Sequence, residues 1–201
     1  VTGMDLVVPD WPAPPRVHAV ATTRGGGVSS GVYRSLNLGD HVGDDPDAVA
    51  ENRRRLAAAL GLASRPRWLR QVHGTAVADA ATAASDPEAD AMIAAAAGTA
   101  CVVLTADCLP VLFCDVAGSR VAAAHAGWRG LAGGVLEATV AALVASGVRA
   151  GDLLAWIGPA IGAAAYEAGD DLRSAFPPNH PHAAAGFTAN ARGPRQLDPP
   201  G

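Results

Sequence analysis

The sequence predicts a single α/β domain, because strand patterns and helix patterns alternate along the chain. Two central apolar runs, 99–108 and 121–125, have the composition of buried strands, and residues 131–146 repeat apolar side chains at helical spacing. Half of the 201 residues are hydrophobic, which suits one globular domain with a sizeable core. Only 4% are aromatic, so we expect this core to consist mainly of Val, Leu and Ala.

Four further segments have the length and composition of strands. They are residues 16–23, 68–77, 89–93 and 153–157. The first is followed by the glycine-rich loop 24–31, whose backbone N–H groups can approach a ligand closely. The second is interrupted at His73-Gly74, so a polar side chain falls in the middle of an apolar segment.

Three segments carry helix signals: 45–61, 131–146 and 166–176. In the first, Asp45 can cap the N-terminus, Pro46 suits the first helical position and Gly61 can end the helix. In the second, an apolar stripe runs to Gly147, which supplies the stop.

The tail, residues 177–201, is rich in proline and has little periodicity, so we expect it to be irregular within one domain spanning 1–201. The net charge is −4 and no lysine or arginine run stands out, which argues against a nucleic-acid or anionic-membrane surface. We see no secretory signal and no apolar segment near 20 residues, so a cytoplasmic location is expected. Three cysteines, an odd number, argue against a disulfide framework.

Five polar residues stand out beside small residues on otherwise apolar segments: His73, Asp107, Cys108, His125 and Arg129. One cysteine and two histidines can hold zinc as three protein ligands and leave a fourth position open, as in catalytic zinc sites. The spacings, 35 residues from His73 to Cys108 and then 17 to His125, match no local zinc motif. Two other interpretations stay open: purely structural residues, or Cys108 as a nucleophile with either histidine as its base.

Seven motifs then occur in order along the chain. They are T-T-R-G-G-G-V-S at 22–29, S-L-N-L-G-D-H-V-G-D-D-P at 35–46, Q-V-H-G at 71–74, A-D-A-M-I at 89–93, T-A-D-C-L-P-V-L at 105–112, H-A-G-W-R-G-L at 125–131 and W-I-G-P-A-I-G at 156–162. Together they resemble the YfiH-like laccase-domain family, also described as polyphenol oxidase or purine nucleoside phosphorylase. The resemblance implies a compact fold of mixed β-sheets flanked by helices, with a zinc site made by His73, Cys108 and His125.

The resemblance also implies phosphorolysis of purine nucleosides (adenosine, inosine, guanosine and methylthioadenosine) and deamination of adenosine. Phosphate needs a cation and N–H donors, which Arg24 and the loop around Gly26 can supply. In deamination an activated water attacks C6 of adenine, and a carboxylate must move protons. The expected catalytic residues are Arg24, Asp107 and Cys108, and the expected substrate-binding residues are Gly26, Asn37 and Arg129. Asp107 would face away from Cys108 on a regular strand and joins the site only if the strand bulges or ends there.

Two alternatives accompany this reading. Thiolate and imidazole also bind copper, so a copper-dependent phenol oxidase is one, although six histidines are few for several copper sites. A zinc-stabilised binding protein without turnover is the other, and no obligate protein partner is expected. Similar proteins often have Cys where this chain has Ala165, and they continue beyond Gly201. We therefore expect a tail that is truncated relative to the family, without a terminal strand and helix.

Overall fold

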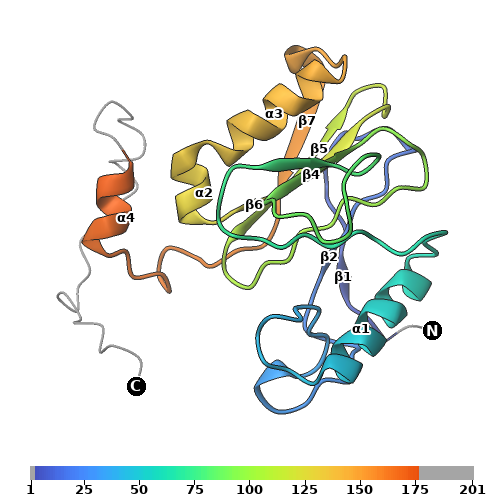
Figure 1. Cartoon of the computed structure of the whole chain (residues 1–201), viewed down its shortest axis with the longest axis vertical. Coiled ribbons are helices and arrows are strands. Elements are labelled where there is room, and N and C mark those ends of the chain that lie inside the picture. The colour runs from blue at the N-terminus through green and yellow to red at the C-terminus, as the bar shows by residue number, and fades with distance from the viewer. Residues whose placement is uncertain (1–2, 177–201) are drawn as a thin grey trace. The chain divides into compact units, whose positions relative to one another are not determined.

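The computed structural model of the chain describes residues 3–176 (Figure 1). The chain divides into two compact units after Ala160. Within the described residues, the second unit contains one short helix, α4 (Asp170–Ala175), where a longer helix over 166–176 was expected. The expected irregular tail, 177–201, and the expected truncation lie outside the described residues.

A five-stranded mixed sheet forms the centre of the first unit (Figure 1). In spatial order its strands are β3 (Val77–Asp79), β4 (Ala91–Ala94), β6 (Val121–Ala126), β5 (Leu109–Asp115) and β7 (Leu153–Ile157). β3 and β4 run parallel, and the other neighbours run antiparallel. A separate antiparallel pair joins β1 (Leu6–Val7) to β2 (Ala21–Thr22). Mixed sheets flanked by helices confirm the predicted fold class.

The helix α1 (Pro46–Ala59) confirms the capping prediction. The Asp45 carboxylate accepts a hydrogen bond of 2.9 Å from the backbone N–H of Asp47, and Pro46 occupies the first helical position. Gly61 follows the last turn with a φ of +61°, in the left-handed region that glycine adopts readily.

The helix expected over 131–146 is instead two helices, α2 (Trp128–Gly133) and α3 (Val135–Ala145). Gly134 separates them with a φ of +96°, which breaks the helical path. Two 3₁₀ turns complete the elements, η1 (Gly31–Tyr33) and η2 (Ala150–Asp152). Within residues 3–176, no helix has both the length and the apolar character needed to cross a bilayer.

The two faces of the central sheet have different partners. On one face Ala91, Val111 and Ala124 pack with the apolar side chains of α3. Because successive strand residues point to opposite faces, Met92 and His125 point away from α3. Met92 is fully buried there, against an apolar cluster that includes side chains from the segment before β5. His125 therefore belongs to the face that the irregular segments cover.

The strand expected over 99–108 is irregular, which changes the place of the polar pair at 107–108. β5 begins at Leu109, so this pair precedes a strand instead of ending one. A side chain replaces the missing strand partner, because the Gln71 amide donates to the carbonyl of Leu104 at 2.8 Å and accepts from its N–H at 2.7 Å. The N–H and the carbonyl of Leu104 are thereby satisfied without a neighbouring strand.

Two other expected strands are largely irregular as well. The segment 68–77 contributes only one isolated bridge, between Arg70 and Glu88, before β3 begins. His73 has a φ of +59°, a left-handed conformation that interrupts any strand. The strand expected over 16–23 is reduced to the two residues of β2.

Candidate metal centre

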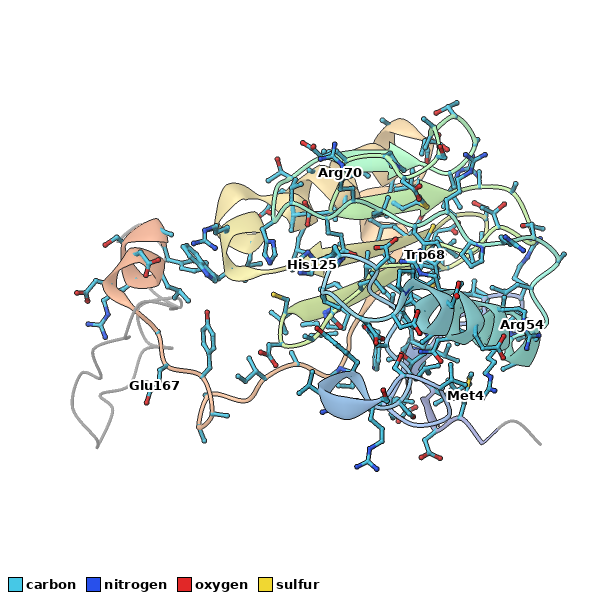
Figure 2. The ribbon with its side chains drawn as sticks, turned by 60° about the horizontal axis from the view of Figure 1, so that its bottom comes forward. Met4, Arg54, Trp68, Arg70, His125 and Glu167 are labelled. Atoms are coloured by element: carbon cyan, nitrogen blue, oxygen red, sulfur yellow. The ribbon has the colours of Figure 1, made fainter. Side chains whose placement is uncertain are left out.

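His73, Cys108 and His125 converge at one point in the structure. Their ligand atoms all lie within 4.8 Å of one another. Donors that share one zinc ion lie about 3.5 Å apart at ordinary bond lengths, so a small contraction would complete the site. His125 is buried (labelled in Figure 2), Cys108 is half-buried and His73 is exposed, which gives the cluster one side open to solvent.

The hairpin of β5 and β6 brings two of these side chains together. Leu109, the first residue of β5, pairs with Ala126, and Pro110 pairs with His125. Cys108, directly before β5, therefore lies beside the end of β6. This register explains how a thiol and an imidazole 17 positions apart meet at one end of the sheet.

Glycines leave the space in which the three ligands meet. A Cβ on Gly127 would lie 2.7 Å from Cδ2 of His73 and 3.1 Å from Sγ of Cys108. The φ of Gly127 is −62°, so space and not backbone conformation requires a glycine. A Cβ on Gly130, in α2, would approach the carbonyl oxygen of Gly74 to 2.9 Å. The turn that carries His73 thus packs directly against α2.

Asp90 is the site residue that sequence reasoning missed. It lies next to β4, is fully buried, and its carboxylate contacts His125 and the turn that carries His73. Its Oδ1 is 2.8 Å from Nδ1 of His125. The signal available in the sequence was a carboxylate inside the apolar segment 89–94.

The electrostatic setting suits a metal ligand set. Burial lowers the pKa of His125 despite its bond to Asp90, so the imidazole is neutral at pH 7 and keeps a lone pair. Burial, and to a lesser extent Asp107 and Asp90, raises the pKa of the Cys108 thiol. Without a metal this cysteine stays protonated at neutral pH and is a weak nucleophile. A bound cation would favour its thiolate form.

A large cleft, about 1080 Å³, opens beside the three ligands. The predicted site residues that line it are Arg24, Asn37, His73, Asp107, Cys108 and His125. The cleft also contains aromatic walls at Tyr33 and Trp156. Among the described residues, Gly26 and Arg129 do not belong to its lining. Arg129 is exposed and its guanidinium lies 4.2 Å above the ring of Trp128.

The glycine-rich loop is held by its own contacts. Arg24 donates from Nε and Nη2 to the carbonyl of Arg34 at 3.2 and 3.0 Å, and from Nη2 to that of Val32 at 3.1 Å. Gly26 has a φ of +93°, and a Cβ there would lie 2.6 Å from the Met4 side chain. Gly26 is thus required by close packing and backbone conformation.

The side chain of Asn37 is also engaged within its loop. Its amide donates to the carbonyl of Gly39 at 3.1 Å and to the Asp44 carboxylate at 2.9 Å. Its oxygen accepts from the N–H of Gly39 at 3.0 Å. Asp107, by contrast, is exposed. It precedes β5, so the alternating directions of strand side chains do not apply to it and do not turn it away from the cleft.

Comparisons with known proteins converge on one family. Residues 18–200 match the family model described as multi-copper polyphenol oxidoreductase laccase. A Pseudomonas aeruginosa relative named purine nucleoside phosphorylase PA4543 is 56% identical over 189 residues, covering 92% of this chain and 74% of the relative. Purine nucleoside phosphorylase YfiH of Escherichia coli is 52% identical over 186 residues, covering 90% and 74%.

Solved structures of similar proteins share the fold. The crystal structure of Neisseria meningitidis protein NMB0706 has a TM-score of 0.86 and 51% identity, with 94% of this chain and 76% of that chain covered. The structure of the Bacillus licheniformis hypothetical protein YfiH has a TM-score of 0.77 and 30% identity, with 87% and 68% covered.

Proposed function

The chain belongs to the laccase-domain family that residues 18–200 match, and from this membership we propose that it is a zinc-dependent purine nucleoside phosphorylase. The observation that carries the proposal is the convergence of His73, Cys108 and His125 on a cleft that also contains Arg24 and Asp107. Relatives more than 50% identical over nine-tenths of the chain bear that enzyme's name, which supports the assignment. Adenosine, inosine, guanosine and methylthioadenosine are the proposed substrates, together with phosphate.

The ligand set fits zinc. Two imidazoles and one thiolate are ligands that zinc accepts, and three protein ligands leave a fourth position for water or substrate. Gly127 lets all three ligand side chains pack against its backbone, because a Cβ there would lie 2.7 Å from Cδ2 of His73, 3.1 Å from Sγ of Cys108 and 3.5 Å from Cε1 of His125. When bound by these three residues, zinc would supply a Lewis acid beside the cleft. His73 and Cys108 would reach it from irregular segments, and His125 from β6.

In phosphorolysis, a phosphate oxygen bonds to C1′ of the ribose while the bond from C1′ to the purine nitrogen breaks. The purine leaves with the bonding electrons and takes up a proton. We assign phosphate binding to Arg24, which lines the cleft, and contact with the ribose or base to Asn37. Asp107 is assigned to proton movement, which its exposure and its place beside Cys108 support. Gly26 and Arg129 stay predicted substrate contacts, although neither lines the cleft.

Adenosine deamination is the second candidate, and it uses the same carboxylate. Water adds at C6 of adenine and ammonia leaves, so one group must take a proton from the water and return it to the departing nitrogen. Asp107 lies on the cleft directly before Cys108, which supports it in this role.

Three other assignments have less support. Multi-copper oxidation needs several metal sites, whereas residues 3–176 contain one cluster of three or more His, Cys, Asp or Glu ligands, which favours a single ion. A cysteine hydrolase needs a reactive thiolate, whereas the pKa of Cys108 is raised. A zinc-stabilised binding protein would be expected to close the fourth ligand position, whereas this cluster borders a large cleft.

The deciding experiment is incubation of metal-analysed protein with adenosine and phosphate, followed by chromatography. Adenine with ribose 1-phosphate indicates phosphorolysis, and inosine without free base indicates deamination. Zinc in a one-to-one ratio, lost together with activity in Cys108→Ala, would support the metal assignment. A protein that contains zinc but releases neither product would contradict the enzyme proposal and favour the binding protein.

Replacement of Arg24 by Ala tests the phosphate assignment. We expect the KM for phosphate to rise about tenfold, because a charge-assisted hydrogen bond is lost, while the KM for nucleoside stays within about twofold. Arg34→Ala is the matched control, since it removes a nearby exposed arginine that is not in the cleft lining among the described residues. Equal increases in both KM values would show that Arg24 only holds the loop through its bonds to the carbonyls of Val32 and Arg34.

A further inference from the structure

We propose that Asp90 is the positioning residue of the metal centre, and that its one carboxylate holds both histidine ligands in the orientation that metal binding needs. It does so by fixing the ring of His125 and, separately, the backbone that carries His73. The inference rests on the metal site of the proposed function, but not on the nucleoside chemistry. It concerns a buried residue whose own side chain is not among the three converging ligands.

Four donors share the two oxygens of this carboxylate. Oδ1 lies 2.8 Å from Nδ1 of His125 and accepts from the N–H of His73 at 3.0 Å. Oδ2 accepts from the N–H of Gly74 at 2.7 Å and from that of Val72 at 3.2 Å. Asp90 is completely buried, so no solvent replaces these partners. Each of the two oxygens accepts at least one backbone N–H bond, so the carboxylate acts as an acceptor through both of them.

The first consequence concerns the tautomer of His125. Oδ1 of Asp90 already accepts the N–H of His73, and Oδ2 accepts two further N–H bonds, so the donor in the contact with His125 is Nδ1, which carries the proton. The lone pair is then on Nε2, the nitrogen left to face the other ligands. A histidine whose second nitrogen is bonded in this way has a fixed ring orientation and is a better metal ligand. The backbone N–H of His125 also donates to the carbonyl of Asp90 at 2.7 Å, which fixes the strand at the same point.

The second consequence concerns the backbone of His73. Its φ of +59° is uncommon for a residue with a side chain and costs on the order of 1 kcal/mol. Three consecutive N–H groups, of residues 72–74, point at one carboxylate and hold this conformation. The left-handed turn is what directs the His73 ring toward His125, whose ring centre is 4.8 Å away at an interplanar angle of 79°.

An asparagine at position 90 cannot reproduce this arrangement, although it has nearly the same shape. Its amide has one acceptor oxygen and one donor nitrogen. If the nitrogen replaces Oδ1, His125 must accept at Nδ1, and the proton moves to Nε2 and blocks ligation. If the nitrogen replaces Oδ2, it opposes the N–H groups of Val72 and Gly74, and the turn that holds His73 opens. Either orientation disables one imidazole.

The test compares Asp90→Asn with Asp115→Asn in the full chain. Asp115 is also a buried aspartate that accepts backbone N–H bonds, from Ser119 and Arg120, but it lies at the other end of β5 from Cys108. Zinc affinity is measured by competition with a chromophoric chelator. We expect a 10- to 100-fold loss for Asp90→Asn, as for other outer-shell substitutions, and a change within about twofold for Asp115→Asn. Equal affinities of the wild type and Asp90→Asn would overturn the proposal.

A second measurement needs no variant. Nitrogen NMR of histidine-labelled, metal-free wild type should show His125 protonated at Nδ1, and a proton at Nε2 would overturn the proposal even if Asp90→Asn fails to fold. A wild type that binds no zinc would overturn both this inference and the proposed function. A wild type that binds zinc without nucleoside turnover would overturn the proposed reaction alone, because the affinity ratio would still support Asp90.

Discussion

Replacement of Gly127 by Ala should lower zinc affinity by at least about 100-fold and activity to a similar extent. The added methyl group would lie 2.7 Å from Cδ2 of His73 and 3.1 Å from Sγ of Cys108, so these two ligands must separate. The backbone of Gly127 has a φ of −62°, which alanine also adopts, so the fold should survive. Zinc titration and the phosphorolysis assay on the same preparation would measure both losses.

Gly151→Ala is the matched control, because a Cβ at that position has open space around it and the φ is not in the left-handed region. We expect this variant to keep the zinc affinity and activity of the wild type. Unchanged zinc affinity of Gly127→Ala would contradict this prediction. It would mean that His73, Cys108 and His125 do not bind zinc in the arrangement that the structure shows.

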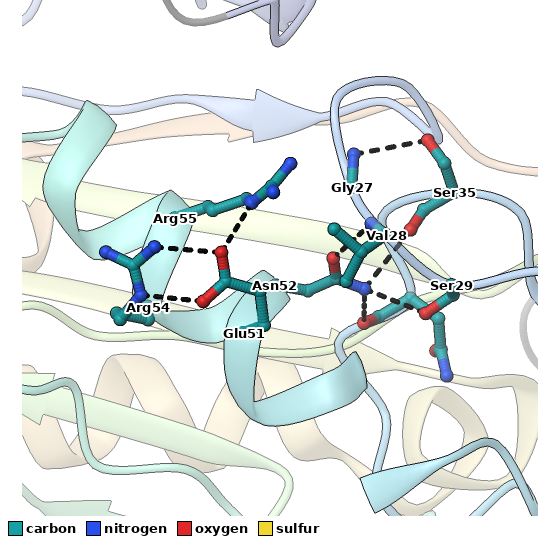
Figure 3. A network of polar contacts seen from close by, with 9 residues as sticks. Gly27, Val28, Ser29, Ser35, Glu51, Asn52, Arg54 and Arg55 are labelled. Carbon is teal, nitrogen blue, oxygen red and sulfur yellow. Dashed lines mark hydrogen bonds and ion pairs between the residues drawn. The ribbon is translucent and has the colours of Figure 1, made fainter. Parts of the chain in front are cut away.

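Replacement of Asn52 by Ala should lower the free energy of unfolding by about 3 kcal/mol. Asn52 is completely buried on α1 and joins it to the loop that follows β2 (Figure 3). Its oxygen accepts from the N–H of Val28 at 2.8 Å, and its amide donates to Oγ of Ser29 and the carbonyl oxygens of Ser35 and Asn37. Truncation leaves several of these groups buried without a partner, which is the costly case.

Chemical denaturation at neutral pH would measure this loss, and Glu51→Ala provides the comparison on the same helix. Glu51 forms ion pairs with Arg54 and Arg55 at the surface (Figure 3), where solvent screens them, so its removal should change stability little. If both variants were equally stable, the buried amide would not be what attaches the loop to α1. We also expect Asn52→Ala to weaken phosphate binding, because the same loop begins at Arg24.

Local signals explain which elements were predicted correctly. Asp45 and Pro46 act on the residues next to them, so the start of α1 follows from the sequence alone. The strand expected over 153–157 coincides with β7, since a short apolar run between turn residues is a local pattern. The helix expected over 131–146 was wrong at Gly134, where a left-handed conformation separates α2 from α3.

Two of the strands that were wrong share one cause. The segments 68–77 and 99–108 have strand composition, but their backbone groups bond to the side chains of Asp90 and Gln71 in place of a neighbouring strand. Such partners lie 16 to 33 residues away in the sequence. The composition of a segment shows how apolar it is, but not which distant group forms hydrogen bonds with its backbone. The irregular path of these two segments therefore could not be predicted from the sequence.

The amino-acid sequence by itself determined the fold class, the limits of α1 and β7, and a short set of residues able to bind a metal or move a proton. Only the tertiary structure decided that His73, Cys108 and His125 face one another, that Gly127 leaves room between them, and that Asp90 holds both imidazoles. The physical reason is that capping and periodicity act over one or two turns of chain, whereas a ligand set depends on strand register and on hydrogen bonds between distant segments.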